Sequence, residues 1–151
     1  MPALAIVAAM SRDNVIGFKG EMPWGHLPRD LKHFKDLTMG HSVVIGYKTL
    51  LSIVKTLGRK DSLLPGRKIY VLTRDPGKLA QFPDCGGVSD VDSVIKLGLQ
   101  GMVFIAGGEK VYHQFVALPQ TLTIHLTQIH ANYAGDTFFP ILHKKEWIME
   151  G

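Results

Sequence analysis

Short apolar runs alternate with stretches of helical periodicity along the chain. The runs are rich in Val, Ile, Leu or Thr and are bounded by Gly, Pro or polar residues, as is typical of buried strands. They predict strands over residues 3–10, 42–46, 68–73, 102–106 and 121–129. Helices are predicted between them, over residues 28–38, 49–57, 90–99 and 109–117. Because strands that alternate with helices indicate β-α-β units, we expect an α/β fold around a largely parallel sheet.

The stretch from Ser11 to Gly25 lacks either periodicity. It contains Gly17, Gly20 and Pro23, which are residues that interrupt regular structure. We therefore expect a long loop beside the carboxyl end of the first predicted strand. Loops of this length often act as lids over a binding site.

The composition is that of an ordinary globular domain. The chain has 151 residues, of which 46% are hydrophobic and 20% are charged, and these values exclude a disordered or low-complexity protein. We expect a single domain over residues 1–151. The chain has 17 Lys and Arg against 13 Asp and Glu, and it lacks the basic runs found in nucleic-acid patches. The net charge of +4 therefore fits a small anionic ligand better than a nucleic acid.

The sequence also bears on the cellular compartment. The single cysteine, Cys85, excludes an internal disulfide and a CxxC site, so we expect a reducing compartment such as the cytoplasm. The apolar run 3–10 follows no basic residue and precedes the polar Ser11-Arg12-Asp13, unlike a signal peptide. No apolar stretch approaches the about 18 residues that span a bilayer, so we expect no membrane insertion.

A carboxylate occupies an unusual place in the predicted helix 28–38. The apolar positions there recur at helical spacing and form the expected core-facing stripe of Leu27, Leu31, Phe34 and Leu37. Asp30 lies one turn before Phe34, at the edge of this stripe. It is either a first-turn carboxylate that favours the helix dipole or a catalytic or substrate-anchoring acid. Trp24 is likewise either a core residue or part of a site.

Another group of residues follows the carboxyl ends of predicted strands. Gly107-Gly108 stands between a strand and a helix, and it forms either a tight turn or a cradle in which the backbone approaches a phosphate. The corresponding positions after two other strands hold Lys48, Thr49, Thr73 and Arg74. Ligands of open α/β sheets bind at the carboxyl ends of the strands, so these residues could converge on a phosphorylated nucleotide. Judged singly, the two cations could equally be solvated surface residues.

Other reactive residue types give weaker signals. Leu64-Pro65-Gly66-Arg67 predicts a turn whose arginine fits an ordinary type II turn and a contact to a carboxylate equally well. The seven histidines show no HxxxH or HExxH spacing, and we expect His125 and His130 on opposite faces of one strand, so we predict no metal site. No serine stands in a GxSxG motif, and Cys85 is expected in a turn, so nucleophilic catalysis is not expected.

Six motifs occur in a fixed order along the chain. They are Val15-Ile16-Gly17, Met22-Pro23-Trp24, Leu27-Pro28-x-Asp30-Leu31-x-x-Phe34-Lys35, Leu64-Pro65-Gly66-Arg67, Gly107-Gly108 with Val111-Tyr112, and Gly135-Asp136-Thr137-x-Phe139-Pro140. Together they resemble dihydrofolate reductase of the bacterial type. The resemblance implies a three-layer α/β/α arrangement. It also implies reduction of 7,8-dihydrofolate to tetrahydrofolate, with hydride transfer from the cofactor NADPH.

The resemblance implies roles for residues around a pterin pocket. Asp30 would be the only ionisable group there and would hydrogen-bond the pterin, with Thr127 in support. Trp24 would help to place a bound water, and Tyr112 would lie near the nicotinamide as the last member of this catalytic group. Arg67 would bind the carboxylate of the glutamate tail. The implied substrate-binding residues are Val7, Ala8, Leu31, Phe34, Ile53, Leu64, Arg67 and Ala106.

The resemblance also implies a cofactor site. The residues along the nicotinamide ribose and the lid would be Ala9, Ile16, Gly17 and Gly20. The other implied cofactor-binding residues are Gly46, Lys48, Thr49, Thr73, Arg74, Gly107, Gly108, Glu109, Lys110, Val111 and Thr137. Two cations near the ribose 2′-position would favour NADPH over NADH. A cis peptide bond would join Gly107 to Gly108.

Several positions depart from the pattern of the family. Tyr47 stands where a basic residue is usual, and Leu50 replaces the usual tryptophan. His26 lengthens the spacing between Trp24 and Asp30. We expect the placement of the site to survive these changes, while the loss of a cation at position 47 weakens one phosphate contact.

The family continues into a final antiparallel strand pair, whereas this chain stops at Gly151. We therefore expect the strand 121–129 at an exposed sheet edge, which proteins usually avoid. Three explanations stay open: a fragment whose missing strands exist elsewhere, an edge covered by a partner chain, and a natural short form. We expect a monomer, or a dimer joined through this strand.

Two other functions stay open from the sequence. A related reductase that acts on a pteridine or on a riboflavin-pathway pyrimidine would have little need for Asp30 beside Phe34, or for Arg67. A non-catalytic protein that binds NADPH or folate would keep the pocket without hydride transfer. In each case the partner is a small molecule, not a nucleic acid or a membrane.

Overall fold

The computed structural model describes residues 3–20, 22–24, 28–143 and 146–149. The predicted loop residue Gly25, the inserted His26 and the predicted stripe residue Leu27 lie outside the described residues.

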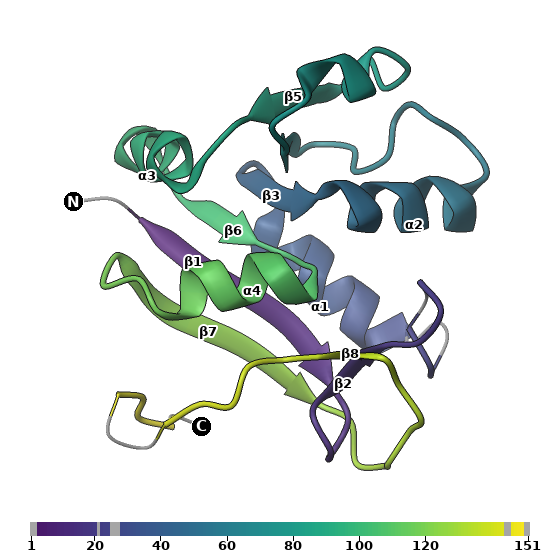
Figure 1. Ribbon diagram of the computed structural model, residues 1–151, viewed down its shortest axis with the longest axis vertical. Coiled ribbons are helices and arrows are strands. Elements are labelled where there is room, and N and C mark those ends of the chain that lie inside the picture. Colours follow the sequence, from purple (N-terminus) through teal and green to yellow (C-terminus); the bar gives the residue numbers. More distant parts are fainter. Residues whose placement is uncertain (1–2, 21, 25–27, 144–145, 150–151) are drawn as a thin grey trace.

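A six-stranded sheet forms the centre of the molecule (Figure 1). In sheet order the strands are β5 (Cys85–Val88), β4 (Lys68–Leu72), β3 (Ser42–Gly46), β6 (Val103–Ile105), β1 (Leu4–Met10) and β7 (Thr121–Gln128). All five neighbouring pairs are parallel, so the prediction of a largely parallel sheet is confirmed. β7 pairs with β1 alone among the described strands and forms an edge of the sheet, as expected for this segment.

Helices cover both faces of the sheet, which confirms the three-layer arrangement. The helices are α1 (Pro28–Thr38), α2 (Tyr47–Leu57), α3 (Val91–Gln100) and α4 (Glu109–Val116), with a short 3-10 turn η1 (Pro76–Leu79). Val94 of α3 and Phe115 of α4 share a buried cluster with Ile6 of β1. Leu50 of α2 packs on the opposite face, in a cluster with Val43 and Ile45 of β3.

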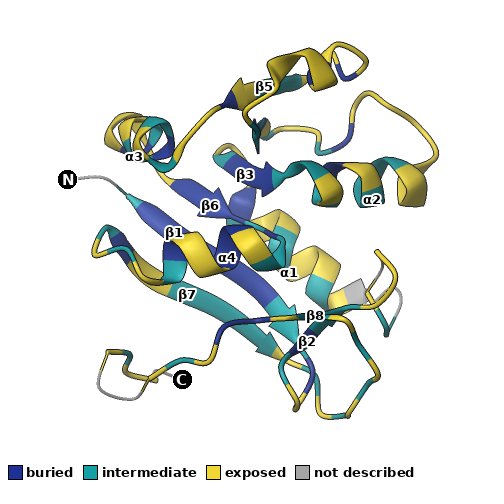
Figure 2. Ribbon diagram, viewed as in Figure 1, coloured by how far each residue is buried: buried dark blue, intermediate teal, exposed yellow. Residues whose placement is uncertain are grey.

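The burial pattern follows from this layering. Neighbouring residues of a strand point to opposite faces, so Leu4 and Ile6 belong to the cluster under α3 and α4, whereas Ala5 and Val7 contact the side of α1. Because both faces are covered, β1, β3 and β6 are buried almost throughout (Figure 2). This explains why the sequence shows continuous apolar runs rather than alternating ones.

Three short strands were not predicted. Val15–Gly17 forms β2, which pairs antiparallel with β8 (Thr137–Phe138), so the prediction of a loop without regular structure over residues 11–25 was wrong here. Cys85 begins β5 and does not lie in a turn. Two glycines weaken the strand signal of β5, yet one of them lets β5 lie beside β4, because a Cβ on Gly86 would be 3.1 Å from Cδ1 of Tyr70.

Smaller corrections concern two helices and one strand. α2 begins at Tyr47, two residues before the predicted start, because Gly46 ends β3 and serves directly as its N-cap. Leu31, predicted on the core-facing stripe of α1, is 42% exposed. His130 lies in a bend beyond β7, so it does not share a strand with His125.

Candidate functional site

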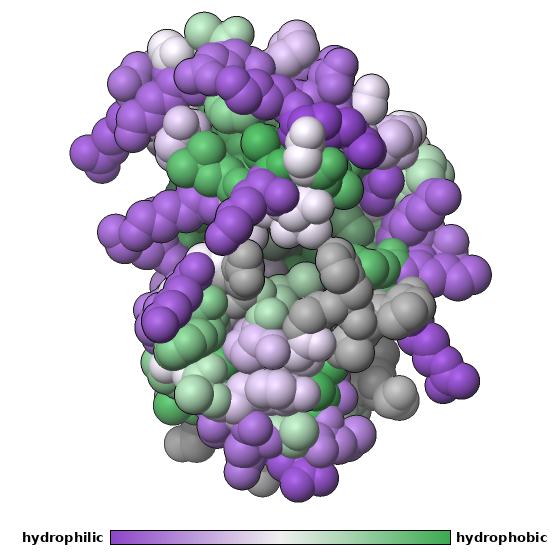
Figure 3. All heavy atoms as spheres, turned by 90° about the vertical axis from the view of Figure 1, so that its right-hand side faces the viewer, coloured by the Kyte–Doolittle hydropathy of each residue, from purple (hydrophilic) through white to green (hydrophobic). Residues whose placement is uncertain are grey.

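The carboxyl ends of the parallel strands form one edge of the sheet, and those of β1, β3 and β6 point toward the right in Figure 1. The segments that follow β1, β3, β4 and β6 carry nearly all of the residues predicted to bind a nucleotide. Figure 3 looks onto this side of the molecule, where hydrophobic side chains reach the surface between hydrophilic ones.

Three glycines bring the ends of β3 and β6 into close contact. The amide of Gly46 donates a hydrogen bond to the carbonyl of Gly107 at 2.9 Å. The peptide bond between Gly107 and Gly108 is cis, as the resemblance implies. A Cβ on Gly108 would stand 3.2 Å from Oγ1 of Thr49, and one on Gly46 would stand 3.2 Å from a methyl group of Val111. The absence of side chains therefore lets the ends of β3 and β6 and the starts of α2 and α4 lie close together.

Two helices begin at these glycines. Gly46 is the N-cap of α2 and Gly108 is the N-cap of α4, and neither helix has a side-chain cap. The amide groups of the first turns therefore lack side-chain acceptors, and the positive ends of two helix dipoles lie next to each other. Such an arrangement suits the binding of an anion such as a phosphate.

Asp30 and Tyr112 come from opposite faces of the sheet and act on each other at this edge. Asp30 lies half-buried in the first turn of α1, whereas Tyr112 is buried in α4. The Tyr112 hydroxyl donates a hydrogen bond to the carbonyl of Val7 at 2.9 Å. Burial raises the pKa of Tyr112, and the negative charge of Asp30 raises it further. The carboxylate thus lies close enough to the phenol for its charge to matter.

Trp24 presents a buried donor without an acceptor. Its Nε1 is shielded from solvent and has no hydrogen-bond partner in the described part of the protein. The ring packs edge-on against Tyr133, with 5.7 Å between the ring centroids. An unpaired buried N–H group typically costs about 1–3 kcal/mol, which an external acceptor such as a water or a ligand atom would remove.

The predicted apolar substrate residues come together between α1 and α2. Phe34 of α1, Ile53 of α2 and Leu64 all pack against one buried cluster. Phe34 and Ala106 also contact the cluster that contains Val7. The corrected position of Leu31 fits this region, because an exposed leucine on α1 is available to an apolar ligand.

Arg67 completes this group at the far end of α1. Gly66 has a φ of 81° and the amide of Arg67 bonds to the carbonyl of Leu64 at 3.2 Å, as in a type II turn. The guanidinium carbon lies 5.9 Å from the ring centroid of Phe34, and one guanidinium nitrogen lies 3.4 Å from Oγ1 of Thr38. Burial lowers the pKa of Arg67. No described carboxylate forms an ion pair with this arginine, which leaves it available to an anionic group.

The remaining predicted residues lie around the same edge. Thr127 of β7 pairs in register with Ala9 of β1. Gly17 pairs with Thr137 in the small β2–β8 sheet. Gly20 lies in an exposed turn with a φ of 81°. The other predicted positions on these elements are the buried Ala8, the half-buried Ile16 and the exposed Lys110.

Glu109 forms a contact that could not be predicted from the sequence. Its side chain accepts a hydrogen bond from the amide of Phe138 at 2.7 Å, which fastens β8 to the start of α4. The carboxylate of Glu109 is therefore already hydrogen-bonded within the protein. Only the backbone amide of this predicted cofactor residue, in the first turn of α4, is left to contact a cofactor.

Cations surround the ends of β3 and β4. Lys48 and Arg74 are exposed and form no ion pair with a described residue. Thr73 accepts a hydrogen bond from the amide of Asp75 at 3.2 Å. A third cation was missed by the sequence analysis: Nζ of Lys78 lies 5.0 Å from the ring centroid of Tyr47. The two residues are 31 positions apart, so no local pattern could indicate this contact.

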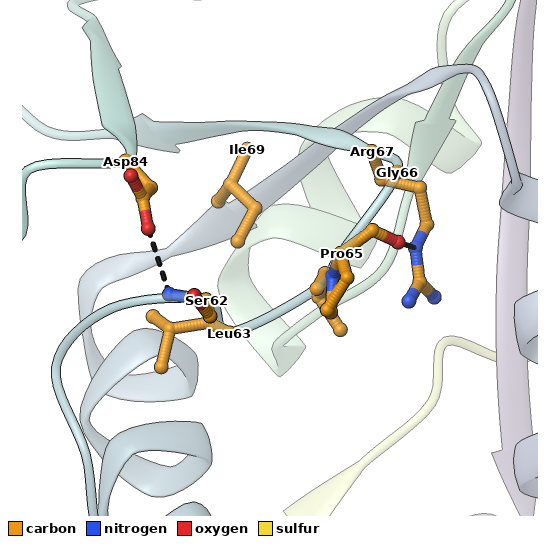
Figure 4. A pocket seen from close by; sticks show the side chains of 8 residues that line it. Ser62, Leu63, Pro65, Gly66, Arg67, Ile69 and Asp84 are labelled. Atoms are coloured by element: carbon orange, nitrogen blue, oxygen red, sulfur yellow. Dashed lines mark hydrogen bonds between the residues drawn. The ribbon is translucent and has the colours of Figure 1, made fainter.

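One cavity lies beside the Arg67 turn, and a second lies at the other end of the sheet. A cavity of about 270 Å³ borders the turn 64–67, with Ser62 and Asp84 at one end and Arg67 at the other (Figure 4). The amide of Ser62 donates a hydrogen bond to Asp84 at 2.7 Å. A second cavity of about 240 Å³ lies at the opposite ends of β3 and β4 and is lined in part by His41, Lys68 and Tyr70.

Within the described ranges, no group of three or more His, Cys, Asp or Glu side chains is arranged to hold a metal ion. A search of the same residues for a helix long and apolar enough to cross a membrane found none.

Comparison with known proteins gives a consistent result. The family model described as dihydrofolate reductase matches residues 3–151. A dihydrofolate reductase of Staphylococcus haemolyticus is 34% identical over 145 residues, which cover 95% of this chain and 80% of that protein. A dihydrofolate reductase of Haloferax volcanii is 38% identical over 151 residues, which cover 95% and 73%. The solved structure of the Enterococcus faecalis dihydrofolate reductase complexed with NADP(H) matches with a TM-score of 0.80 and 32% identity, covering 95% of this chain and 80% of that one.

Proposed function

We propose that Asp30 anchors the substrate of this chain, which belongs to the dihydrofolate reductase family. The activity of the chain is the NADPH-dependent reduction of 7,8-dihydrofolate to 5,6,7,8-tetrahydrofolate. The observation that carries the role of Asp30 is that this half-buried carboxylate in the first turn of α1 acts electrostatically on the buried Tyr112, whose helix begins at the glycine pair. A carboxylate there can accept hydrogen bonds from the amino and ring N–H groups of a pterin.

Glycines and helix termini would hold the cofactor. NADPH supplies, when bound, the hydride that reduces the pterin ring. Gly46 and Gly108 carry no side chain that would separate the backbone from a pyrophosphate, to which the first turns of α2 and α4 would donate N–H groups. Around them, Lys48 and Arg74 neutralise phosphate charge, since neither is engaged in an ion pair with a described residue. Ala9, Ile16, Gly17 and Gly20 border the nicotinamide end.

An apolar slot between α1 and α2 would take the body of dihydrofolate. Phe34, Ile53 and Leu64 line it, because they pack against a common cluster. Arg67 binds the carboxylate of the glutamate tail through its guanidinium group, which the ring of Phe34 already orients. Asp30 lies in the first turn of α1 and Arg67 contacts Phe34 and Thr38 toward its end, so the pterin would lie at the first turn and the tail at the last.

Proton transfer to the ring would depend on Asp30 and Trp24. The unpaired Nε1 of Trp24 donates a hydrogen bond to a water molecule, which positions this water for the carboxylate. Thr127 supports the carboxylate from β7. Reduction places a hydride on carbon and a proton on the neighbouring nitrogen, so a positioned acid accelerates the reaction.

The role of Asp30 is tested by replacing Asp30 with Asn. We expect Asp30→Asn to lower kcat/KM for dihydrofolate about 10²–10⁴-fold at neutral pH, as measured by the oxidation of NADPH. The matched control is Asp36→Asn on the same helix, because Asp36 is exposed and pairs with Lys32. This control should retain activity within about twofold.

Two results would count against the proposal. Full activity of Asp30→Asn would remove Asp30 from the reaction. Equal losses in Asp30→Asn and Asp36→Asn would indicate a general effect on α1 instead of a specific one on the substrate. The expected monomeric state and cytoplasmic location stay predictions from the sequence.

A further inference from the structure

A cation that belongs to none of the motifs lies at the adenosine side of the cofactor site. Lys78 is exposed on η1, and its Nζ stands 5.0 Å from the ring centroid of Tyr47, the first residue of α2. Position 47 is also where the sequence lacks the basic residue that we expected to contact a phosphate. We propose that Lys78 binds the phosphate monoester of the NADPH ribose and that Tyr47 holds Lys78 in place for this contact. The inference rests on the proposed cofactor site.

The strand order places Lys78 at the correct end of the dinucleotide. Gly46 of β3 is in register with Leu72 of β4, so the residues that follow, Tyr47 and Thr73, start from neighbouring points of the sheet edge. β4 lies one strand beyond β3 on the side away from β6. A dinucleotide whose pyrophosphate occupies the ends of β6 and β3 therefore has its adenosine at the end of β4, next to η1.

The main chain that carries Lys78 is firmly anchored. The amide of Lys78 bonds to the carbonyl of Asp75 at 3.2 Å, and Oδ1 of Asp75 accepts the amide of Gly77 at 3.1 Å. Leu79 is buried and belongs to the cluster under α2. A Cβ on Gly87 would be 3.2 Å from Leu79, so β5 packs closely against the same turn.

The charges nearby leave the ammonium group available. Asp75 is the nearest carboxylate in sequence, but its side chain caps η1 and forms no ion pair with Lys78 within the described ranges. Together with Arg74, Lys78 presents two cations within one short turn. A phosphate monoester carries close to two negative charges at neutral pH, whereas the ribose hydroxyl of NADH carries none.

The aromatic ring gives this lysine a defined direction. An ammonium group over a ring face is attracted by the ring quadrupole, and this attraction reduces the number of conformers of an exposed side chain. A lysine restricted in this way loses less conformational entropy on binding. Tyr47 is thus a positioning residue for the phosphate contact.

The test is the preference for NADPH over NADH, measured by titration calorimetry of the full chain. We expect Lys78→Met to raise the Kd of NADPH about fivefold to tenfold and to change the Kd of NADH less than twofold. Lys78→Arg should keep most of the preference. Lys96→Met on α3 is the matched control, because Lys96 is an exposed lysine on another element, and it should change neither Kd.

Variants of the ring test the positioning role. Tyr47→Phe keeps the ring face and should bind NADPH as the unchanged chain does, whereas Tyr47→Leu should weaken NADPH binding about twofold to threefold. Equal weakening of NADPH and NADH by Lys78→Met would overturn the inference, and so would an unchanged preference. Failure of the unchanged chain to bind NADPH would instead contradict the proposed function, so the two failures are distinguishable.

Discussion

Replacing Gly135 with Ala tests how the β2–β8 sheet is held beside the proposed cofactor site. A Cβ on Gly135 would overlap with Cγ1 of Val15 and come within 2.9 Å of the carbonyl oxygen of Gly17. Val15 is 1% exposed, so its side chain has little room to move. The Gly17 carbonyl also accepts the amide of Asp136 at 3.0 Å, and a shift of this carbonyl would weaken that hydrogen bond.

The size of the effect follows from these two contacts. Overpacking of a well-filled site costs about 1–3 kcal/mol, and a lost backbone hydrogen bond adds about 0.5–1.5 kcal/mol. We expect Gly135→Ala to lower the free energy of unfolding by about 2 kcal/mol. For a domain of this length such a loss lowers Tm by roughly 4–8 °C.

Urea denaturation and thermal unfolding measure the loss. Gly101→Ala is the matched control, because a Cβ on Gly101 meets nothing within 4 Å, and it should stay within about 0.5 kcal/mol of the unchanged chain. In the background of Val15→Ala, the cost of Gly135→Ala should fall, since the overlapping methyl group is gone. The Kd of NADPH should rise for Gly135→Ala well below Tm, because β2 carries Ile16 and Gly17. A loss below about 0.5 kcal/mol would show that the close contact at Gly135 does not constrain β2.

Two further predictions concern charge. Arg67→Lys should raise the KM for dihydrofolate about tenfold with little change in kcat, because a charge-assisted contact to a remote carboxylate acts equally on substrate and transition state; a change in kcat alone would contradict the role. Burial lowers the pKa of His125, and the charge of the nearby His33 lowers this pKa further. As the pH falls below about 6.5, His125 is therefore protonated more readily in the unfolded chain than in the folded one. The free energy of unfolding should therefore fall below that pH, and His125→Gln should flatten this part of the pH profile in urea denaturation; an unchanged slope would exclude His125 as its source.

The parts of the fold with a strong local signal could be predicted from the sequence. The buried strands β1, β3 and β4 show continuous apolar runs, and Pro28 marks the start of α1. Gly107 and Gly108 were correctly placed between a strand and a helix, because an apolar run precedes the pair and helical periodicity follows it. These features depend on neighbours in the chain, which is the information that a pattern contains.

The parts that depend on distant neighbours could not be predicted. β2 has three residues, and its partner β8 comes about 120 positions later, so neither has a pattern of its own. Two glycines hide β5, which exists as a strand because β4 pairs with it. The contact between Glu109 and the amide of Phe138 and the contact between Lys78 and Tyr47 likewise require the folded chain.

The geometry of Tyr112 bears on the source of the transferred proton. Its hydroxyl already donates to the carbonyl of Val7, and burial raises its pKa, with a further contribution from the charge of Asp30. A phenol that is both engaged as a donor and resistant to ionisation is a poor general acid. The alternative route for the proton is the carboxylate of Asp30 together with a water molecule at Trp24. The Nε1 of Trp24 can hold this water, because it lacks an acceptor among the described residues. This agrees with the proposal that the proton comes through Asp30 and a water molecule held by Trp24, and that Tyr112 has a positioning role on the nicotinamide side.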